Sequence, residues 1–176
     1  SPFWSKLFNA QASATAGIWM SPPIPAGGLT TAQQRNWKKV WASDNYDPDP
    51  VLAQSVWMGA AAAHDGHIVW GTLQIPGLGP RSLVKAYGFP NLLLLPTSFE
   101  NSLRTAAVFR GKLNDAGEFR AEVLYGDATL PRYFSTGKRK GFWLNVPNRT
   151  GPPKLGPAGF GQPATSYIWS MGVHQD

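Results

Sequence analysis

The spacing of hydrophobic and polar positions along the chain changes near residue 67. Before this point, apolar residues recur at helical intervals in two stretches, residues 31–43 and 50–64. Thr31 opens the first stretch with a capping-box pattern. Asp49, followed directly by a proline, suits the start of the second. We therefore predict two short helices near the N-terminal third of the chain.

After this point the pattern is typical of strands. Residues 67–75, HIVWGTLQI, are rich in β-branched and aromatic side chains, and SLVKAYGF (82–89) and NLLLL (91–95) are further strand candidates. A strand pair around 131–146 and a last strand at 165–173 complete the pattern. We predict a mainly β fold of the α+β class. Its antiparallel sheet is rolled or forms two layers, and the two short helices pack at one end.

The clearest element is a hairpin over residues 104–126. A type I turn at Asn114–Gly117, with Gly117 in the left-handed conformation, fixes the pairing of the two strands. Counting outward from this turn gives one apolar and one polar side. The predicted pairs are Leu113 with Phe119, Phe109 with Val123, Ala107 with Tyr125 and, on the polar side, Arg110 with Glu122.

The first thirty residues lack a regular pattern. Their segment SPPIPAGG (21–28) contains three prolines and two glycines, which interrupt helices and central strands. We interpret residues 1–30 as an extended arm and residues 31–176 as a single globular domain. An apolar cluster near the start of the arm needs a surface to pack on, either the chain's own core or a neighbouring subunit. The predicted partner-binding residues in it are Phe3, Trp4 and Phe8, and Leu7 lies between them.

The composition favours a folded chain with a sparsely charged surface. Hydrophobic residues make up 43% of the 176 positions, and charged residues only 15%, against about 25% in an average globular domain. Such a surface is typical of a protein that is covered by partners. The net charge of +6 is compatible with binding a polyanion. No apolar run approaches the ~18 residues of a membrane span. We therefore expect a soluble chain, and its location, including a virion or an extracellular site, stays open.

Candidate chemistry is sparse. The chain has no cysteine, which excludes thiolate catalysis and metal sites built on sulfur. His64, Asp65 and His67 could ligate a metal, but Asp-Gly is also an ordinary turn pair. Asp44, Asp47 and Asp49 fit turn and cap chemistry better than a calcium loop. Neither a nucleophile elbow nor a phosphate-binding loop is present. We predict no catalytic residue, metal or cofactor, and leave open whether the chain is an enzyme.

One stretch, residues 135–151, combines cations with aromatic rings. Alternation along its second strand places Phe142, Leu144 and Val146 toward the core and leaves Trp143 on the other side. Cations on a turn beside exposed rings can bind single-stranded nucleic acid through phosphates and stacked bases. The charged tip of an ordinary hairpin would look the same. The candidate nucleic-acid-binding residues are Arg132, Lys138, Arg139, Lys140 and Trp143.

Three functions fit these observations. The first is a non-enzymatic structural or interaction subunit of a larger assembly, of the virion or cell-envelope type, with protein subunits as partners. The second is a single-stranded nucleic-acid-binding protein that uses the basic-aromatic hairpin. The third is a barrel or sandwich that binds a small molecule or carbohydrate, with Trp70, Trp143 and Trp169 as platforms.

Overall fold

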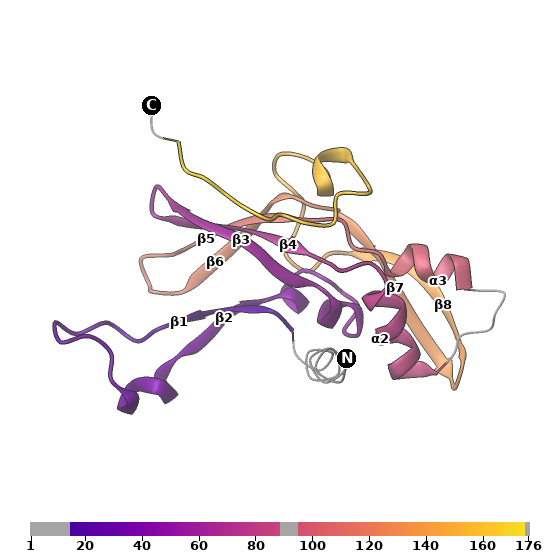
Figure 1. Ribbon diagram of the computed structural model, residues 1–176, viewed down its shortest axis with the longest axis horizontal. Helices are drawn as coiled ribbons and strands as arrows, with labels where there is room; N and C mark the ends of the chain where they lie inside the picture. The colour runs from indigo at the N-terminus through magenta and orange to yellow at the C-terminus, as the bar shows by residue number, and fades with distance from the viewer. Residues whose placement is uncertain (1–14, 89–94, 175–176) are drawn as a thin grey trace, which may run out of the picture.

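The computed structural model describes residues 15–88 and 95–174, and this part of the chain is mainly antiparallel β-structure with short helices (Figure 1). The strands are β1 (Gly17–Met20), β2 (Lys38–Ala42), β3 (Trp57–His64), β4 (His67–Leu73), β5 (Val108–Leu113), β6 (Phe119–Tyr125), β7 (Thr129–Gly137) and β8 (Lys140–Pro147). The α-helices are α2 (Leu78–Tyr87) and α3 (Leu95–Ser102), and short 3-10 turns cover Thr31–Asn36, Ser43–Asn45, Leu52–Ser55 and Ala158–Gly161.

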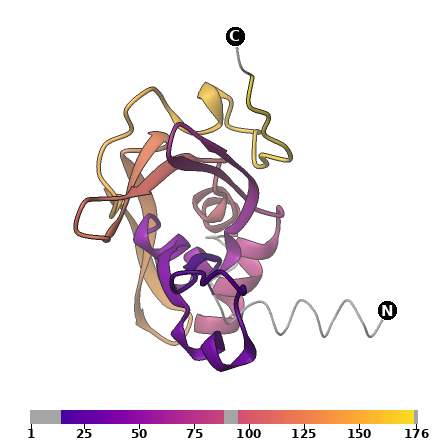
Figure 2. The ribbon, with the colours of Figure 1, turned by 90° about the vertical axis from the view of Figure 1, so that its left-hand side faces the viewer.

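The described strands form three antiparallel sheets. The central sheet has the order β3-β4-β5-β6, and β1-β2 and β7-β8 are two-stranded. In Figures 1 and 2 the β1–β2 hairpin lies below the central sheet and the C-terminal segment lies above it. Helices α2 and α3 lie beside β7 and β8 (Figure 1). The prediction of a mainly β fold with antiparallel sheets is confirmed at this level.

The predicted hairpin of residues 104–126 is formed by β5 and β6. The Gly117 N–H donates to the Asn114 carbonyl over 2.9 Å, and Gly117 has φ of 76°. Three predicted pairs are confirmed: Leu113–Phe119, Phe109–Val123 and Arg110–Glu122. The fourth is wrong, because an irregularity after Val108 shifts the pairing and sets Val108, rather than Ala107, opposite Tyr125.

The predicted helix over residues 31–43 is wrong beyond its first turn. A capping box is present, but it joins Thr30 to Gln33, and the 3-10 turn ends at Asn36. The chain then becomes β2, which pairs with β1 inside the segment that the sequence had suggested as an extended arm. Trp41 of β2 is buried against the central sheet. This packing overrides the local helical spacing.

The predicted helix over residues 50–64 is also wrong. Asp49 caps as expected, since its carboxylate accepts the backbone N–H groups of Val51 and Leu52. Only a 3-10 turn follows, and residues 57–64 are strand β3. The run of alanines in this strand has a high intrinsic helix propensity. Pairing with β4 nevertheless makes this segment a strand.

Helix α2 replaces a predicted strand. Residues 82–87 lie in α2, which begins after Gly77 (φ 90°) and ends at Gly88 (φ 81°). The spacing of Gly79, Leu83 and Tyr87 puts them on one side of the helix, and this side packs toward the body of the protein. The neighbouring prediction, a strand at 91–95, falls largely outside the described residues.

The predicted last strand at 165–173 is reduced to an isolated antiparallel bridge, in which Tyr167 pairs with Leu73 at the end of β4. Ile168 donates its N–H to the Thr72 carbonyl and accepts the N–H of Ala60. It lies over Gly71 of β4, where an added Cβ would be 2.4 Å from the Cβ of Ile168. The missing side chains of Gly59 and Gly71 therefore create the space in which this segment lies. We call residues 165–169 the strap.

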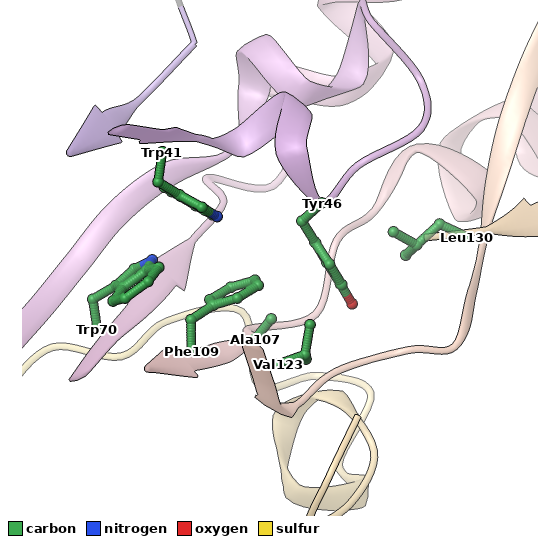
Figure 3. Packing of buried hydrophobic residues seen from close by; sticks show 7 residues of the cluster. All are labelled: Trp41, Tyr46, Trp70, Ala107, Phe109, Val123 and Leu130. Atoms are coloured by element: carbon green, nitrogen blue, oxygen red, sulfur yellow. The ribbon is translucent and has the colours of Figure 1, made fainter. Parts of the chain in front are cut away.

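The main core lies between β2 and the central sheet (Figure 3). Trp41 points from β2 toward Trp70 of β4 and Phe109 of β5, with ring centroids 5.2 and 5.1 Å away. Tyr46 meets Phe109 edge to face at 5.1 Å. Figure 3 also shows Val123 and Leu130 completing the cluster. These aromatic contacts attach the β1–β2 hairpin to the sheet.

A buried polar network joins the loop before β3 to the strands that carry the basic hairpin. The Arg104 guanidinium donates to Asp47 over 2.6 Å and to the Pro131 carbonyl over 2.7 Å. Asp49 accepts the backbone N–H of Tyr133 over 2.8 Å. Burial raises the pKa of Asp47 above its ordinary value, although Arg104 acts in the opposite direction. The two aspartates therefore serve as turn and anchor groups.

Candidate interaction surfaces

The basic-aromatic stretch forms the hairpin of β7 and β8, as its sequence predicts. Tyr133 pairs with Trp143, and Phe134 pairs with Phe142. Directly opposite residues share a side of the sheet, so each pair presents its rings on the same side. Tyr133 is buried and Phe142 is 48% exposed. The predicted orientation is therefore inverted near the tip, where Trp143 faces the body and Phe142 faces solvent. Val146, at the other end of β8, is half-buried opposite buried Leu130.

The inner side of this hairpin belongs to a second hydrophobic cluster. Tyr133 packs there with Leu52 and Leu83, and half-buried Trp143 meets the Tyr133 ring at 5.2 Å. Burial raises the pKa of Tyr133, so its hydroxyl stays protonated at neutral pH. Trp143 thus has a packing role, although the sequence suggested it as a contact for nucleic acid.

The outer side carries a stacked pair of rings. Phe134 and Phe142 lie 5.6 Å apart with nearly parallel planes, and the Arg132 guanidinium lies 4.8 Å from the centre of the Phe134 ring. Leu144, opposite Arg132, is 50% exposed. Arg132 thus covers the ring of Phe134, and the neighbouring ring of Phe142 is accessible to solvent. Nucleic-acid bases and other flat groups stack on accessible aromatic rings.

The tip of the hairpin holds three exposed cations, Lys138, Arg139 and Lys140. Arg139 has φ of 61°, and its backbone N–H donates to the carbonyl of Tyr87 at the end of α2 over 3.2 Å. Its side chain passes next to Gly88. A cation in this position is favoured by the partial negative charge of a helix C-terminus. Arg139 therefore helps to complete α2, while Lys138 and Lys140 extend the charge into solvent.

A second candidate surface is the β1–β2 hairpin with its long connecting loop. Trp19, Ile24 and Trp37 are large apolar residues in this region, and their exposed fractions are 56%, 68% and 42%. Figure 1 shows that the outer part of the hairpin extends away from the central sheet. Exposed aromatic residues in such a projection are typical of protein contact surfaces.

The tryptophans suggested as carbohydrate platforms differ in position. Trp70 is fully buried in the main core, so it cannot present a platform. Trp169 is 78% exposed and stacks on Tyr167 with ring centroids 5.4 Å apart. Trp169 thus extends the exposed aromatic surface to the end of the strap. The structure does not bring the three tryptophans together at one site.

The histidine cluster forms the turn between β3 and β4. His64 pairs with His67, and Asp65 and Gly66 between them have positive φ values of 46° and 70°. The His67 ring nitrogen Nδ1 lies 2.8 Å from the Asp65 carbonyl. Within residues 15–88 and 95–174, no group of three or more His, Cys, Asp or Glu side chains is placed to hold a metal ion. Turn geometry accounts for this motif.

The predicted partner-binding residues Phe3, Trp4 and Phe8 lie outside the described residues. Sequence reasoning missed half-buried Phe134 and exposed Phe142 and Leu144 as one outward-facing set, because both sides of β8 carry apolar residues and alternation alone leaves its orientation open. The pairing of Arg132 with Leu144 was an available signal, since a charged residue indicates the solvent side.

Comparison of the chain with protein-family models, curated protein sequences and solved structures gives no match. Among the helices of the described residues, none has the length and apolar character needed to cross a membrane.

Proposed function

We propose that this chain is a non-enzymatic structural subunit of a larger protein assembly, of the virion or cell-envelope type. The observation that carries the proposal is the projecting β1–β2 hairpin, on which Trp19, Ile24 and Trp37 are exposed. Apolar area of this kind gains free energy when it is removed from water. A partner that covers these side chains supplies that burial.

The charge distribution supports the same proposal. Only 15% of residues are charged, yet the β1–β2 region also holds Arg35, Lys38 and Lys39. An apolar patch with a charged rim resembles the usual arrangement of protein interfaces, in which a desolvated centre is surrounded by polar residues. The rim favours correct orientation, and the apolar centre provides affinity.

The proposal is tested by the mass of the native particle. Light scattering after size exclusion, over a hundredfold range of protein concentration, is expected to show an oligomer that dissociates on dilution. Trp19→Ser together with Trp37→Ser is expected to shift the population toward monomer. The matched control is Trp169→Ser, which removes an even more exposed tryptophan ring outside the hairpin. A monomer at every concentration would contradict the proposal for self-assembly.

A second candidate function is single-stranded nucleic-acid binding by the outer side of β7–β8. The observation that favours it is the Phe134–Phe142 stack, with Arg132 over one ring and Lys138 and Lys140 at the tip. Stacking one base on an aromatic ring contributes about 1–3 kcal/mol. The surface thus combines a stacking platform with cations for the phosphates.

Fluorescence anisotropy with a labelled single-stranded oligonucleotide tests this candidate. Affinity is expected to fall steeply with added salt, because phosphate binding releases counterions. Phe142→Ala and the double change Lys138→Ala/Lys140→Ala are expected to weaken binding. Phe160→Ala and Lys38→Ala/Lys39→Ala remove equivalent groups elsewhere and serve as controls. If the hairpin variants and the control variants lose affinity equally, binding is nonspecific charge attraction and the candidate function is wrong.

A further inference from the structure

An apolar groove of about 390 Å³ lies between the β1–β2 hairpin and the ends of the central strands. Ile18, Ile68 and Phe119 are half-buried in it and pack against the main core cluster. Trp19 and Leu113 line the groove with exposed fractions of 56% and 50%. The groove is thus a side of the hydrophobic core that is open to solvent.

The groove has the size and chemistry of a receptor for large apolar side chains. Its volume falls within the range of about 300–1,000 Å³ that is usual for binding pockets. Only two of its lining residues, His67 and Lys112, carry an ionisable side chain. Aromatic anchors in a pocket of this kind often carry most of the binding energy of an interface. The groove therefore suits an aromatic segment better than a charged ligand.

The chain itself contains a segment with this chemistry. Residues 1–14, which precede the described structure, include Phe3, Trp4, Leu7 and Phe8, and Lys6 is their one charged side chain. These apolar residues form two pairs four positions apart, a spacing that presents them on one side when a segment binds as a helix. The segment leads directly into β1, whose residues line the groove.

The direction of β1 favours binding of the N-terminal segment to the groove of a second copy and not to the groove of its own chain. The Ala16 carbonyl accepts the N–H of Ser43 at the inner end of β1, and β1 runs outward from there along the groove. To enter its own groove, the preceding chain would have to reverse direction. Residues 10–16, AQASATA, contain neither glycine nor proline, the residues that most often permit tight reversals. Between Trp4 and Thr15, 11 residue steps span up to about 36 Å when extended, which is enough to reach a neighbour.

We propose that this groove binds the N-terminal segment of a second copy of the chain, with Trp4 and its apolar neighbours as anchors. This inference rests on the proposed function and names the contact through which subunits join. The contact is apolar and nearly uncharged. The association is therefore expected to change little with added salt, unlike binding to nucleic acid.

Site-directed crosslinking tests the inference, because the chain has no cysteine of its own. Full-length Ser5→Cys and Leu113→Cys chains with tags of different size are mixed and oxidised; Ser5 adjoins Trp4, so its replacement keeps all of the proposed anchors. A disulfide-linked heterodimer is expected to form at least tenfold faster than with Leu155→Cys, the control. Leu155 is an apolar residue of 63% exposure outside the groove. Equal rates for the two partners would overturn the inference.

The double variant Ser5→Cys/Leu113→Cys shows whether the bound segment comes from the same chain or from a second copy. Linked dimers and larger species are expected, whereas a monomer with an internal disulfide would show that the segment occupies its own groove and would overturn the proposal. Leu113→Glu is expected to reduce the native mass, and Leu155→Glu to leave it unchanged. If removal of residues 1–14 leaves the oligomer intact, the inference fails while the proposed function stands. A full-length chain that is always monomeric contradicts both.

Discussion

The Arg104 guanidinium lies 2.6 Å from the Asp47 carboxylate, and both side chains are at most 4% exposed. This ion pair ties the loop before β3 to the segment before β5, and the Pro131 carbonyl on β7 accepts a further hydrogen bond from Arg104. A buried pair of this kind is costly to break, because the remaining charge has no water to solvate it.

Replacing Arg104 by Met is therefore expected to lower the free energy of unfolding by about 3–5 kcal/mol, measured by urea denaturation. The comparison is Arg110→Met, which removes the exposed partner of Glu122 and is expected to cost at most about 1 kcal/mol. Adding Asp47→Leu to Arg104→Met is expected to recover part of the loss. Similar costs for the two arginines would show that the buried pair has no special role.

The strap depends on the absence of a side chain at Gly71. Gly71→Ala is expected to destabilise the protein by about 1–3 kcal/mol, because the new methyl group collides with Ile168. Proteolysis within residues 165–173 is expected to become faster. Gly172→Ala, where an added Cβ meets nothing within 4 Å, is the control. If cleavage of the two variants is equally fast, the strap does not need the space at Gly71.

The inverted orientation of β8 gives a direct prediction about neighbouring residues. Trp143→Ala is expected to cost about 2–3 kcal/mol, less than a fully buried tryptophan, because it removes packing against Tyr133. Phe142→Ala is expected to cost no more than about 1 kcal/mol, since that ring is half in solvent. Chemical denaturation of both variants measures the difference. A larger loss of stability for Phe142→Ala would mean that Phe142, and not Trp143, faces the core, as alternation predicts.

Asp127 gives a prediction for pH dependence. Burial raises the pKa of this carboxyl, although a backbone hydrogen bond from Ala158 and the charge of Arg104 act in the opposite direction. Between the ordinary value of about 3.9 and the raised value, the folded protein binds more protons than the unfolded chain. The contribution of Asp127 to the free energy of unfolding therefore falls as pH rises through this window.

Denaturation of the wild type and of Asp127→Asn at a series of pH values measures this contribution. The stability of the wild type relative to the variant is expected to be greatest at the acidic end and to level off above the raised pKa. Asp115→Asn, in an exposed turn, controls for the loss of one charge. A relative stability that rises with pH would mean that folding lowers the pKa of Asp127 instead of raising it.

The elements that sequence predicted well are those determined by local chemistry. The turn at Asn114–Gly117 fixes the pairing of β5 with β6 through one left-handed glycine and short-range hydrogen bonds. The β7–β8 hairpin was also placed correctly. The bulge after Val108 has no comparable sequence signal, so the pairing with Tyr125 was missed.

The elements that sequence predicted poorly are those determined by distant contacts. Residues 57–64 look helical by spacing, yet they pair with β4 and lie under Ile168 from the other end of the chain. Trp41 lies on a strand because the packing of its ring against Trp70 and Phe109 stabilises that conformation. For the candidate site, the basic tip was found from sequence. The outward-facing Phe134–Phe142 stack could be placed only with knowledge of which side of the β7–β8 hairpin packs on Leu52 and Leu83.

The strap has a consequence for how the chain is made. Gly59 and Gly71 leave the ribosome long before Ile168, so the two strands that carry them begin to fold without the segment that later covers them. Until that segment arrives, part of the sheet is uncovered and able to pair with another chain. Newly made copies therefore pass through an interval in which association with a neighbour competes with completion of their own fold.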